Sequence, residues 1–327
     1  PVRQSNLCME ITLPTKPLYS VQDENGEVAL CTLSAVNLGA LDSLDELEDI
    51  TEIIVRALDS LLDYQDYPIR AAELASMNRR TLGIGVTNLA YYLAKNGAKY
   101  SDGSGNELVH KTFEALQYYS LKASNILAGE LGACPSFGET KYAQGQMPID
   151  TYKKDVDAFC SNALELDWDK LRQDIKATGL RNSTLTALMP CESSSQISNS
   201  TNGIEPPRGF VSIKQSKDGI LKQIVPEYEA LKNQYELLWD IKDNEGYLQL
   251  CAIMQKFVDQ SISTNTHYDP SQYDGNKVPM KLFLMDLLKA YKYGVKTLYY
   301  HTTRDGGGEG AIEKEDDNAC ADGVCKL

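Results

Sequence analysis

Hydrophobic residues recur at helical spacing in four long segments of the chain. The clearest segment is residues 43–64, where Ser43 and Glu46 have the spacing of a capping box and a stripe of leucines and isoleucines follows. The other three segments are residues 106–133, 246–263 and 278–294. Helices therefore account for most of the regular structure that the pattern predicts.

Short apolar runs with turn residues at their ends lie between these helices. They predict strands at residues 6–13, 28–36, 81–89, 183–189 and 295–301. Strands that alternate with long helical segments are typical of parallel α/β architecture. Two alternating runs around Lys217, Asp218 and Gly219 predict one inserted β-hairpin. We expect one α/β body over residues 1–304.

Composition supports a globular protein and excludes several partners. The chain has 327 residues, of which 42% are hydrophobic, and a net charge of -14 from 32 basic and 46 acidic residues. Nucleic acid and anionic membranes are therefore poor partners. No apolar run has the roughly 20 residues of a membrane span, and no secretion signal is recognisable at the start. We expect a cytoplasmic protein whose cysteines are mostly free thiols.

The last part of the chain, residues 305–327, has almost nothing to bury in a core. It is glycine-rich and acidic, and it carries Cys320 and Cys325 close to its end. Two thiols this close in a flexible segment can cycle between dithiol and disulfide with little strain. Structural zinc needs a second pair of ligands that the neighbouring residues do not offer, so we expect no bound metal. The pattern predicts a flexible tail carrying a redox dithiol.

A candidate anion site follows the predicted strand at residues 183–189. The strand ends at Pro190, and the next residues before a short helix are Cys191, Glu192, Ser193 and Ser194. Backbone N–H groups between a strand and a helix start can bind phosphate. An ordinary helix cap in a serine-rich loop is the alternative, and the sequence leaves both open.

Two glycines and two tyrosines also have more than one interpretation. Gly83 and Gly85 lack a third glycine at dinucleotide-binding spacing, so they indicate close backbone packing. Tyr299 and Tyr300 end the last predicted strand, where adjacent side chains normally point to opposite faces. They are either one buried and one exposed ring or a redox-active aromatic pair.

The remaining cysteines are expected to behave as small buried hydrophobic residues when each is considered alone. Cys8 lies on the first predicted strand, with its neighbours on the opposite face. The same expectation applies to Cys31, Cys134, Cys160 and Cys251.

Several motifs together resemble the large (α) subunit of class I ribonucleotide reductase. They are SNLCMEI, RRTLGIGV, GLRNSTLTALMP with SSSQISNSTNGIEPPRG, KTLYY, and the paired cysteines of the tail. Their order and spacing match over essentially the whole chain. The tail cysteines and the double tyrosine point to the class Ia form, which acts on ribonucleoside diphosphates. The resemblance implies the second five-stranded half of a ten-stranded α/β barrel, with surrounding helices and a flexible tail.

The resemblance also implies roles for individual residues. Cys8 matches the cysteine that becomes oxidised to a disulfide as the ribose loses its 2′-hydroxyl. Tyr299 and Tyr300 match the stacked pair that relays a radical from the small (β) subunit, which generates it at a di-metal tyrosyl-radical site. Cys320 and Cys325 match the tail thiols that reduce the active-site disulfide and are themselves reduced by thioredoxin or glutaredoxin. Residues 190–194 match the loop that holds the substrate diphosphate.

The sequence differs from the family pattern in two ways that affect the predicted substrate binding and the predicted activity. Cys191 stands where relatives have serine or threonine, which replaces a hydroxyl donor by a weak thiol donor. The finger-loop cysteine that carries the radical, the second disulfide cysteine and the effector-binding region have no counterpart. We therefore expect one part of a split or fragmentary large subunit, active only with an N-terminal large-subunit polypeptide. Two alternatives remain: a non-catalytic remnant that binds reductase subunits, and a thiol carrier that uses only the tail cysteines.

Overall fold

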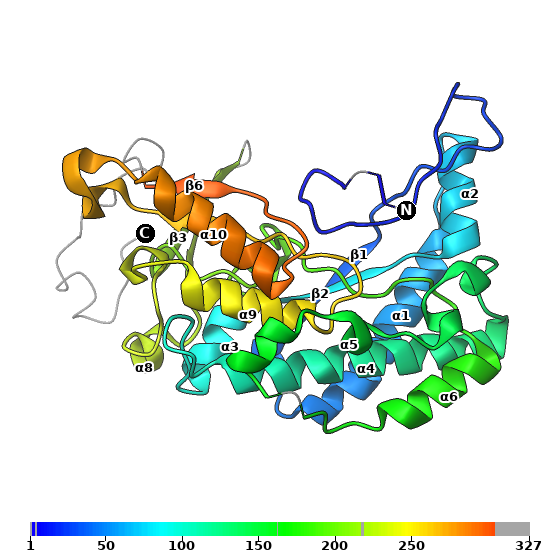
Figure 1. Ribbon diagram of the computed structural model, residues 1–327, viewed down its shortest axis with the longest axis horizontal. Helices are drawn as coiled ribbons and strands as arrows, with labels where there is room; N and C mark the ends of the chain where they lie inside the picture. The colour runs from blue at the N-terminus through cyan, green and yellow to red at the C-terminus, as the bar shows by residue number, and fades with distance from the viewer. Residues whose placement is uncertain (1, 4, 162, 217–218, 305–327) are drawn as a thin grey trace.

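The computed structural model describes residues 2–3, 5–161, 163–216 and 219–304 (Figure 1). Its α-helices are α1 (Leu47–Tyr64), α2 (Arg70–Arg79), α3 (Leu89–Lys95), α4 (Asn106–Leu131), α5 (Pro148–Thr151), α6 (Trp168–Thr178), α7 (Ser194–Ile197), α8 (Tyr228–Leu231), α9 (Glu245–Gln255) and α10 (Met280–Tyr293). Its strands are β1 (Leu33–Asn37), β2 (Gly83–Thr87), β3 (Val211–Ser216), β4 (Gly219–Ile224), β5 (Thr266–Tyr268) and β6 (His301–Thr303). None of the described helices is long and apolar enough to cross a membrane.

A run of parallel segments passes through the middle of the molecule. β1 pairs with β2 in parallel along its full length. Isolated parallel bridges then join Ile84 of β2 to Thr186, and Leu188 to Ile262. β5 pairs in parallel with β6. Parallel pairing between segments that helices separate in the sequence confirms the predicted α/β class. The inserted hairpin is also confirmed, since β3 and β4 are antiparallel, although residues 217–218 of its turn lie outside the described residues.

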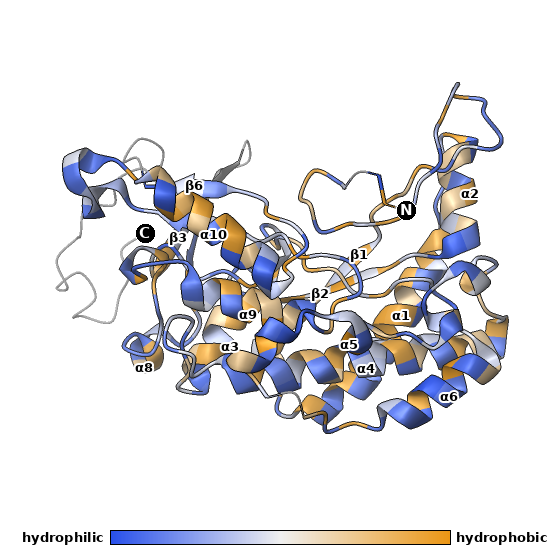
Figure 2. Ribbon diagram, viewed as in Figure 1, coloured by the Kyte–Doolittle hydropathy of each residue, from blue (hydrophilic) through white to orange (hydrophobic). Residues whose placement is uncertain are grey.

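Helices cover one side of these strands. α4 packs against α1, α6 and α9, and in Figure 1 α1, α4 and α6 form a layer below β1 and β2. α1 contributes Leu47, Val55, Leu58 and Leu62 to the main hydrophobic core, and all four side chains are buried. Figure 2 shows that α6 is largely hydrophilic, as expected for a helix at the outside of the layer.

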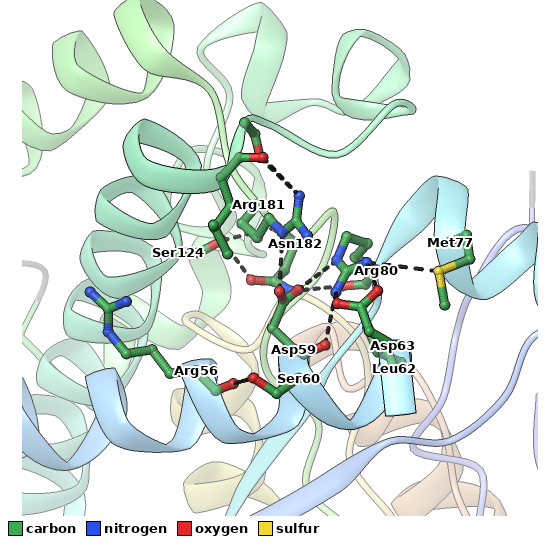
Figure 3. Close-up of polar contacts among 12 residues, drawn as sticks. Arg56, Asp59, Ser60, Leu62, Asp63, Met77, Arg80, Ser124, Arg181 and Asn182 are labelled. Carbon is green, nitrogen blue, oxygen red and sulfur yellow. Dashed lines mark hydrogen bonds and ion pairs between the residues drawn. The ribbon is translucent and has the colours of Figure 1, made fainter. Parts of the chain in front are cut away.

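A buried polar network joins the helix layer to the strands (Figure 3). Arg80, which follows α2 with left-handed backbone angles (φ 46°, ψ 49°), donates to Oδ1 of Asp59 at 2.7 Å and to Asp63 at 2.9 and 2.7 Å. Asp59 also accepts hydrogen bonds from Arg181 and Asn182, each at 3.0 Å. Because Asp59, Arg80 and Asn182 are buried, this network fixes how α1 and α2 meet the segment that leads into the 183–189 region.

The predicted first strand, residues 6–13, is wrong. The chain bends before Met9, whose φ is 67°. The backbone N–H of Ile11 donates to the side-chain oxygen of Asn6 at 3.1 Å, so a side chain takes the hydrogen bond that a strand partner would otherwise accept. The segment nevertheless lies against the strands, since Ile11 packs with Ala187 in a small apolar cluster.

The predicted helix at residues 246–263 is too long. α9 ends at Gln255, and the chain then pairs with the segment around Leu188. The N–H of Leu188 donates to the carbonyl of Ser261 at 3.1 Å, and the N–H of Ser263 donates back to Leu188 at 2.9 Å. The segment stays rich in apolar residues on both sides of Gln255, and hydrophobic periodicity does not mark the boundary between a buried helix and a buried extended segment.

The last predicted strand, residues 295–301, overlaps β6 only at His301. Residues 295–300 have no regular secondary structure and run beside the chain that leads into β5. The N–H of Tyr299 donates to the carbonyl of Thr264 at 2.7 Å, and Thr297 donates through its hydroxyl to the carbonyl of Ile262 at 2.8 Å. The two tyrosines therefore lie just before the regular strand.

Candidate functional site

A cavity of about 380 Å³ opens where the carboxyl ends of β1 and β2 meet the segment around residue 189. It is lined by Leu33, Ser34, Ala35, Asn37, Thr87, Met189, Cys191, Ser194 and Ser198. Ligands of parallel α/β sheets bind at the carboxyl ends of the strands. Hydroxyl and amide groups from three segments share this space, which suits a polar ligand with several oxygen atoms.

Close backbone packing forms one wall of the cavity. A Cβ atom added at Gly85 would lie 2.7 Å from the sulfur of Met189 and 2.8 Å from the carbonyl oxygen of Ala187. A Cβ atom at Gly83 would lie 2.4 Å from the side chain of Leu33. The interpretation of these glycines as close-packing residues is confirmed, because side chains there would push the strands apart.

Hydrogen bonds fix the polar side of the cavity. Asn88 has φ 72° and donates from Nδ2 to Oδ1 of Asn37 at 2.9 Å. Its own Oδ1 accepts the backbone N–H of Thr201 at 2.9 Å, and the hydroxyl of Thr87 donates to the carbonyl of Thr201 at 2.8 Å. The ends of β1 and β2 are thus tied to the chain that follows α7.

The predicted anion loop contributes two of its five residues to the cavity. Cys191 and Ser194 line it, whereas Pro190, Glu192 and Ser193 are not among the lining residues. Glu192, Ser193 and Ser194 are exposed to solvent. The loop therefore presents its polar groups partly to the cavity and partly to its mouth.

The thiol of Cys191 does not point to a ligand. Its sulfur lies 3.6 Å from the carbonyl oxygen of Val86 and 3.7 Å from that of Met189, in the geometry of a thiol donor. The backbone N–H of Cys191 donates to Oδ1 of Asn202 at 2.7 Å. Burial raises the pKa of the thiol, so Cys191 stays protonated and uses both of its donors within the protein.

Cys8, Tyr299 and Tyr300 form a second group. The hydroxyl of Tyr299 lies 3.8 Å from the sulfur of Cys8 and is oriented to donate to it. The rings of Tyr299 and Tyr300 have centroids 3.9 Å apart and planes inclined by 35°. The hydrogen bond with Tyr300 is the main reason that the pKa of Tyr299 is well above its usual value. The structure therefore brings the predicted aromatic pair together and places it against the predicted redox cysteine.

The two tyrosines do not alternate between faces as strand residues would. The N–H of Tyr300 donates to the side-chain oxygen of Asn265 at 2.8 Å instead of continuing the backbone ladder. The side chain of Tyr300 is 57% exposed, while that of Tyr299 is half-buried. An oxidant outside the chain would therefore reach Tyr300 before Tyr299.

Buried polar groups hold the bend that carries Cys8. Ser263 donates through its hydroxyl to the carbonyl of Cys8 at 2.5 Å and lies 3.3 Å from Oε2 of Glu10. Glu10 is buried and accepts from Nδ2 of Asn6 at 2.8 Å. Leu188, which pairs with Ser263, precedes the cavity residue Met189, so the cysteine and the cavity share one supporting segment.

The other cysteines divide into buried and exposed ones. Cys134, Cys160 and Cys251 are buried, as predicted, and burial raises the pKa of Cys134 to about 11 and that of Cys251 to about 12. The prediction for Cys31 is wrong, because this residue is exposed. Cys320 and Cys325 lie outside the described residues.

Several residues of these two groups were not predicted. Ser34, Asn37, Thr87 and Ser198 line the cavity, and Glu10 supports Cys8. Asn37 and Thr87 could have been predicted, because ligands bind at the carboxyl ends of parallel strands and both residues lie at or near such ends. The role of Glu10 depends on a bend that the strand pattern hid.

Comparison with known proteins places the chain in a family. The family model described as "Ribonucleotide reductase, barrel domain" matches residues 1–301. The chain is 66% identical to the ribonucleoside-diphosphate reductase subunit alpha of Haemophilus influenzae and 49% identical to that of Enterobacteria phage T4, in each case over 100% of this chain and 43% of the relative. The ribonucleoside-diphosphate reductase 1 subunit alpha of Salmonella typhimurium is 67% identical, with the same coverage.

This chain spans less than half the length of these curated relatives. The family model covers nearly all of the body described above, including Cys8 and both tyrosines. The chain therefore belongs to the ribonucleotide reductase barrel-domain family, as its motifs predicted.

Proposed function

We propose that this chain forms part of a ribonucleoside-diphosphate reductase large subunit and contributes to the radical-based reduction of ribonucleoside diphosphates to deoxyribonucleoside diphosphates. The observation that carries this proposal is the line of Tyr300, Tyr299 and Cys8, with ring centroids 3.9 Å apart and a 3.8 Å contact between hydroxyl and sulfur. A chain that only bound other subunits would have no need for two stacked, oxidisable rings beside a thiol.

The tyrosine pair acts as a one-electron relay in this proposal. A radical generated in a separate di-metal small subunit oxidises the exposed Tyr300, which loses one electron and one proton. Tyr299 then reduces Tyr300 and is itself oxidised, because the stacked rings are in contact. The oxidising equivalent passes on to a cysteine that a complementing polypeptide supplies. This chain binds no radical cofactor of its own in this scheme.

Cys8 acts as a two-electron reductant together with a second thiol. The ribose loses its 2′-hydroxyl as water and gains two electrons and two protons, while the two thiols become one disulfide. Cys320 and Cys325 then exchange with that disulfide, restore the active-site thiols and become a disulfide themselves. Thioredoxin or glutaredoxin supplies the two electrons that reduce the tail. Cys8 is half-buried, which suits a thiol that must meet both a substrate and a tail.

The substrate diphosphate is assigned to the cavity at the ends of β1 and β2. The hydroxyl of Ser194 and the side-chain amide of Asn37 line this cavity and suit phosphate oxygens, and the hydroxyls of Thr87 and Ser198 could join them by turning away from the backbone carbonyls to which they donate. The half-buried Cys8 is linked to it through Ser263 and Leu188. This arrangement supports a ribose held between the phosphate-binding residues and the reducing thiol.

The parallel strands support the proposed half-barrel. Within the described residues, β1 pairs with β2 and β6 pairs with β5, so the run has an open edge at each end. Open edges present unpaired backbone N–H and C=O groups, which another polypeptide can satisfy. We assign that role to an N-terminal large-subunit polypeptide that supplies the first half of a ten-stranded barrel.

The small subunit is assigned to a surface on α10. Met280, Leu284, Leu288 and Tyr291 are each at least half exposed, and Figure 2 shows hydrophobic residues along this helix. Phe283 of α10 contacts the ring of His301 at 4.4 Å between centroids, one residue beyond the exposed Tyr300. A partner covering this apolar surface would lie next to the tyrosine that must receive the radical.

Reconstitution tests the proposal. The chain is mixed with an N-terminal large-subunit polypeptide, a radical-bearing small subunit and a thioredoxin system, and CDP reduction is measured with each component omitted in turn. We expect deoxy-CDP only in the complete mixture. A stable complex without deoxy-CDP would contradict catalysis and favour the binding remnant, whereas thiol exchange without subunit binding would favour the thiol carrier.

A further inference from the structure

Three potential metal ligands meet outside the cavity and the tyrosine pair. Glu107 and His110 are three residues apart near the start of α4 and therefore share one face of the helix. Cys160 comes from the segment that follows the short helix at Lys154–Ala158. One ligand atom from each side chain lies within 4.8 Å of the other two.

Contacts between α4 and this segment hold the three side chains in place. Asn106 donates through Nδ2 to the carbonyl of Phe159 at 2.9 Å. The N–H of Ser161 donates to Oε1 of Glu107 at 2.6 Å, so the residues on both sides of Cys160 are tied to the helix. The site is thus formed by the fold and needs only small side-chain movements to bind an ion.

The ligand set selects the class of ion. A thiolate, an imidazole and a carboxylate match the sulfur, nitrogen and oxygen ligands of Zn²⁺ and similar borderline-soft cations. His110 and Cys160 are buried, whereas Glu107 is exposed. An ion can enter beside the carboxylate, and water can complete a tetrahedron there.

A buried lysine competes for the same place. The Nζ atom of Lys256 lies 2.9 Å from Nε2 of His110 and 3.3 Å from the carbonyl oxygen of Ser161. The Lys256 side chain is buried, and its ammonium lies 4.7 Å from the ring of Tyr152. A metal ion that binds Nε2 of His110 must displace this ammonium, because the nitrogen lone pair serves one partner at a time and the two cations repel each other.

We propose that Glu107, His110 and Cys160 bind a borderline-soft divalent cation, with Zn²⁺ as the natural occupant, and that Lys256 sets the affinity by competition. On binding, the S–H bond of Cys160 breaks, its proton leaves to solvent, and a sulfur–metal bond forms. The ammonium of Lys256 turns away from His110. The ion would clamp the start of α4 to residues 159–161, and this inference does not depend on the proposed reductase activity.

One local pattern in the sequence is compatible with this proposed site, although the cysteine spacing predicts no bound metal. Glu107 and His110 form a Glu-x-x-His motif, a spacing that presents two ligands on one helical face. The proposed third ligand, Cys160, is 53 residues beyond Glu107, and the sequence predicts only that it is a buried hydrophobic residue. The fold brings the three together.

Cobalt binding tests the site. Co²⁺ is titrated into the full chain with Cys320→Ser and Cys325→Ser, which removes the tail thiols as competing ligands. We expect a near-ultraviolet thiolate-to-cobalt band and the visible bands of a tetrahedral ion. The Kd should rise at least about tenfold in Glu107→Gln, His110→Gln and Cys160→Ser. The matched control Cys134→Ser, which removes another buried thiol, should bind as the parent does.

Several outcomes would overturn the site. One is a parent chain without the thiolate band, and another is a band that survives Cys160→Ser. Circular dichroism without metal checks that each variant folds, and Glu107→Gln keeps the test decisive because its exposed side chain is not needed for the core. Zn²⁺ should raise the Tm of the parent and of Cys134→Ser, and equal stabilisation of Cys160→Ser would also contradict the proposal.

Lys256→Met tests the competition. Removing the ammonium should lower the Kd for Co²⁺ by at least about tenfold, because the ion no longer displaces a buried charge. Lys154→Met is the control, since the Lys154 ammonium lies over the ring of Tyr152 at 3.7 Å but does not hydrogen bond to His110 in the structure. Weaker binding in Lys256→Met would overturn the competitive role.

Discussion

The hydroxyl of Tyr299 lies 3.8 Å from the sulfur of Cys8, although 291 residues separate them in the sequence. The contact exists because the bend at residues 7–9 and the chain just before β6 are both hydrogen bonded to residues 263–265. A thiol and a phenol in contact, with a second phenol stacked behind, suit the movement of single electrons. This contact is the core of the functional proposal.

Cys191 and Ser194 should differ in their effect on substrate binding. Because the thiol of Cys191 points to backbone carbonyls, Cys191→Ser should change the KM for CDP in the reconstituted mixture by less than about threefold. Ser194 lines the cavity, so Ser194→Ala should raise KM about tenfold by removing a donor to a charged phosphate. The exposed Ser193→Ala is the control. An unchanged KM in Ser194→Ala would show that the diphosphate binds elsewhere, and a large change in Cys191→Ser would show that the residue 191 side chain does contact it.

Gly85 should tolerate no side chain. Gly85→Ala places a methyl group 2.8 Å from the carbonyl oxygen of Ala187, and backbone cannot move aside cheaply. We expect a loss of about 1–3 kcal/mol in the free energy of unfolding and a changed cavity, since Met189 must also shift. Gly138→Ala meets nothing within 4 Å and should stay within about 0.5 kcal/mol of the parent. Urea unfolding of both variants compares them, and equal stabilities would refute the packing argument.

Arg80 and Arg56 both form ion pairs with carboxylates of α1, but they should contribute very different amounts to the free energy of unfolding. Arg80→Ala leaves Asp59 buried without its main partner, which should cost about 3–5 kcal/mol. Arg56→Ala removes exposed ion pairs to Glu52 and Glu130 and should cost less than about 1 kcal/mol. Chemical denaturation measures both changes. Similar losses in the two variants would mean that the network in Figure 3 does not hold the helices to the strands.

Acid should destabilise the fold through His267. Burial lowers the pKa of its ring from 6.5 to about 4, and neither ring nitrogen has a hydrogen-bond partner among the described residues. Between these pH values the unfolded chain binds a proton that the folded chain does not, so stability falls as the pH drops from 6.5 to 4. The contribution is about 3 kcal/mol at most.

His267→Asn should therefore flatten part of this pH dependence, measured as Tm between pH 4 and 7. The control His301→Asn changes an exposed ring whose pKa is lowered only by partial burial, and it should leave most of the slope in place. If Tm depends on pH in His267→Asn as steeply as in the parent, protonation of His267 is not the cause of the acid destabilisation.

The sequence predicted the parallel α/β class, the hairpin and the role of Gly83 and Gly85 because each has a local signal in pattern or spacing. It did not predict the bend before Met9, because the side chain of Asn6 replaces a strand partner there. It also missed the end of α9, since apolar residues such as Phe257 and Val258 recur beyond Gln255 and no glycine or proline marks the end of the helix.

The candidate site shows the same division. Tyr299 and Tyr300 stood out by their position, and only the structure shows that their rings stack instead of pointing to opposite faces. The cavity could not be predicted as a unit, because Ser34, Thr87 and Ser198 come from three segments that the fold brings together. Each of those residues alone is an ordinary polar side chain.

The most direct test of the account is CDP reduction by Tyr299→Phe in the complete reconstituted mixture. Phenylalanine keeps the shape of the ring but has no hydroxyl to lose a proton, so the relay from Tyr300 through Tyr299 to the cysteine of the complementing polypeptide is interrupted. Tyr64→Phe, a change at an exposed tyrosine on α1, is the matched control. We predict no deoxy-CDP with Tyr299→Phe at unchanged subunit binding, and parental rates with Tyr64→Phe. Parental turnover by Tyr299→Phe would contradict the proposed relay.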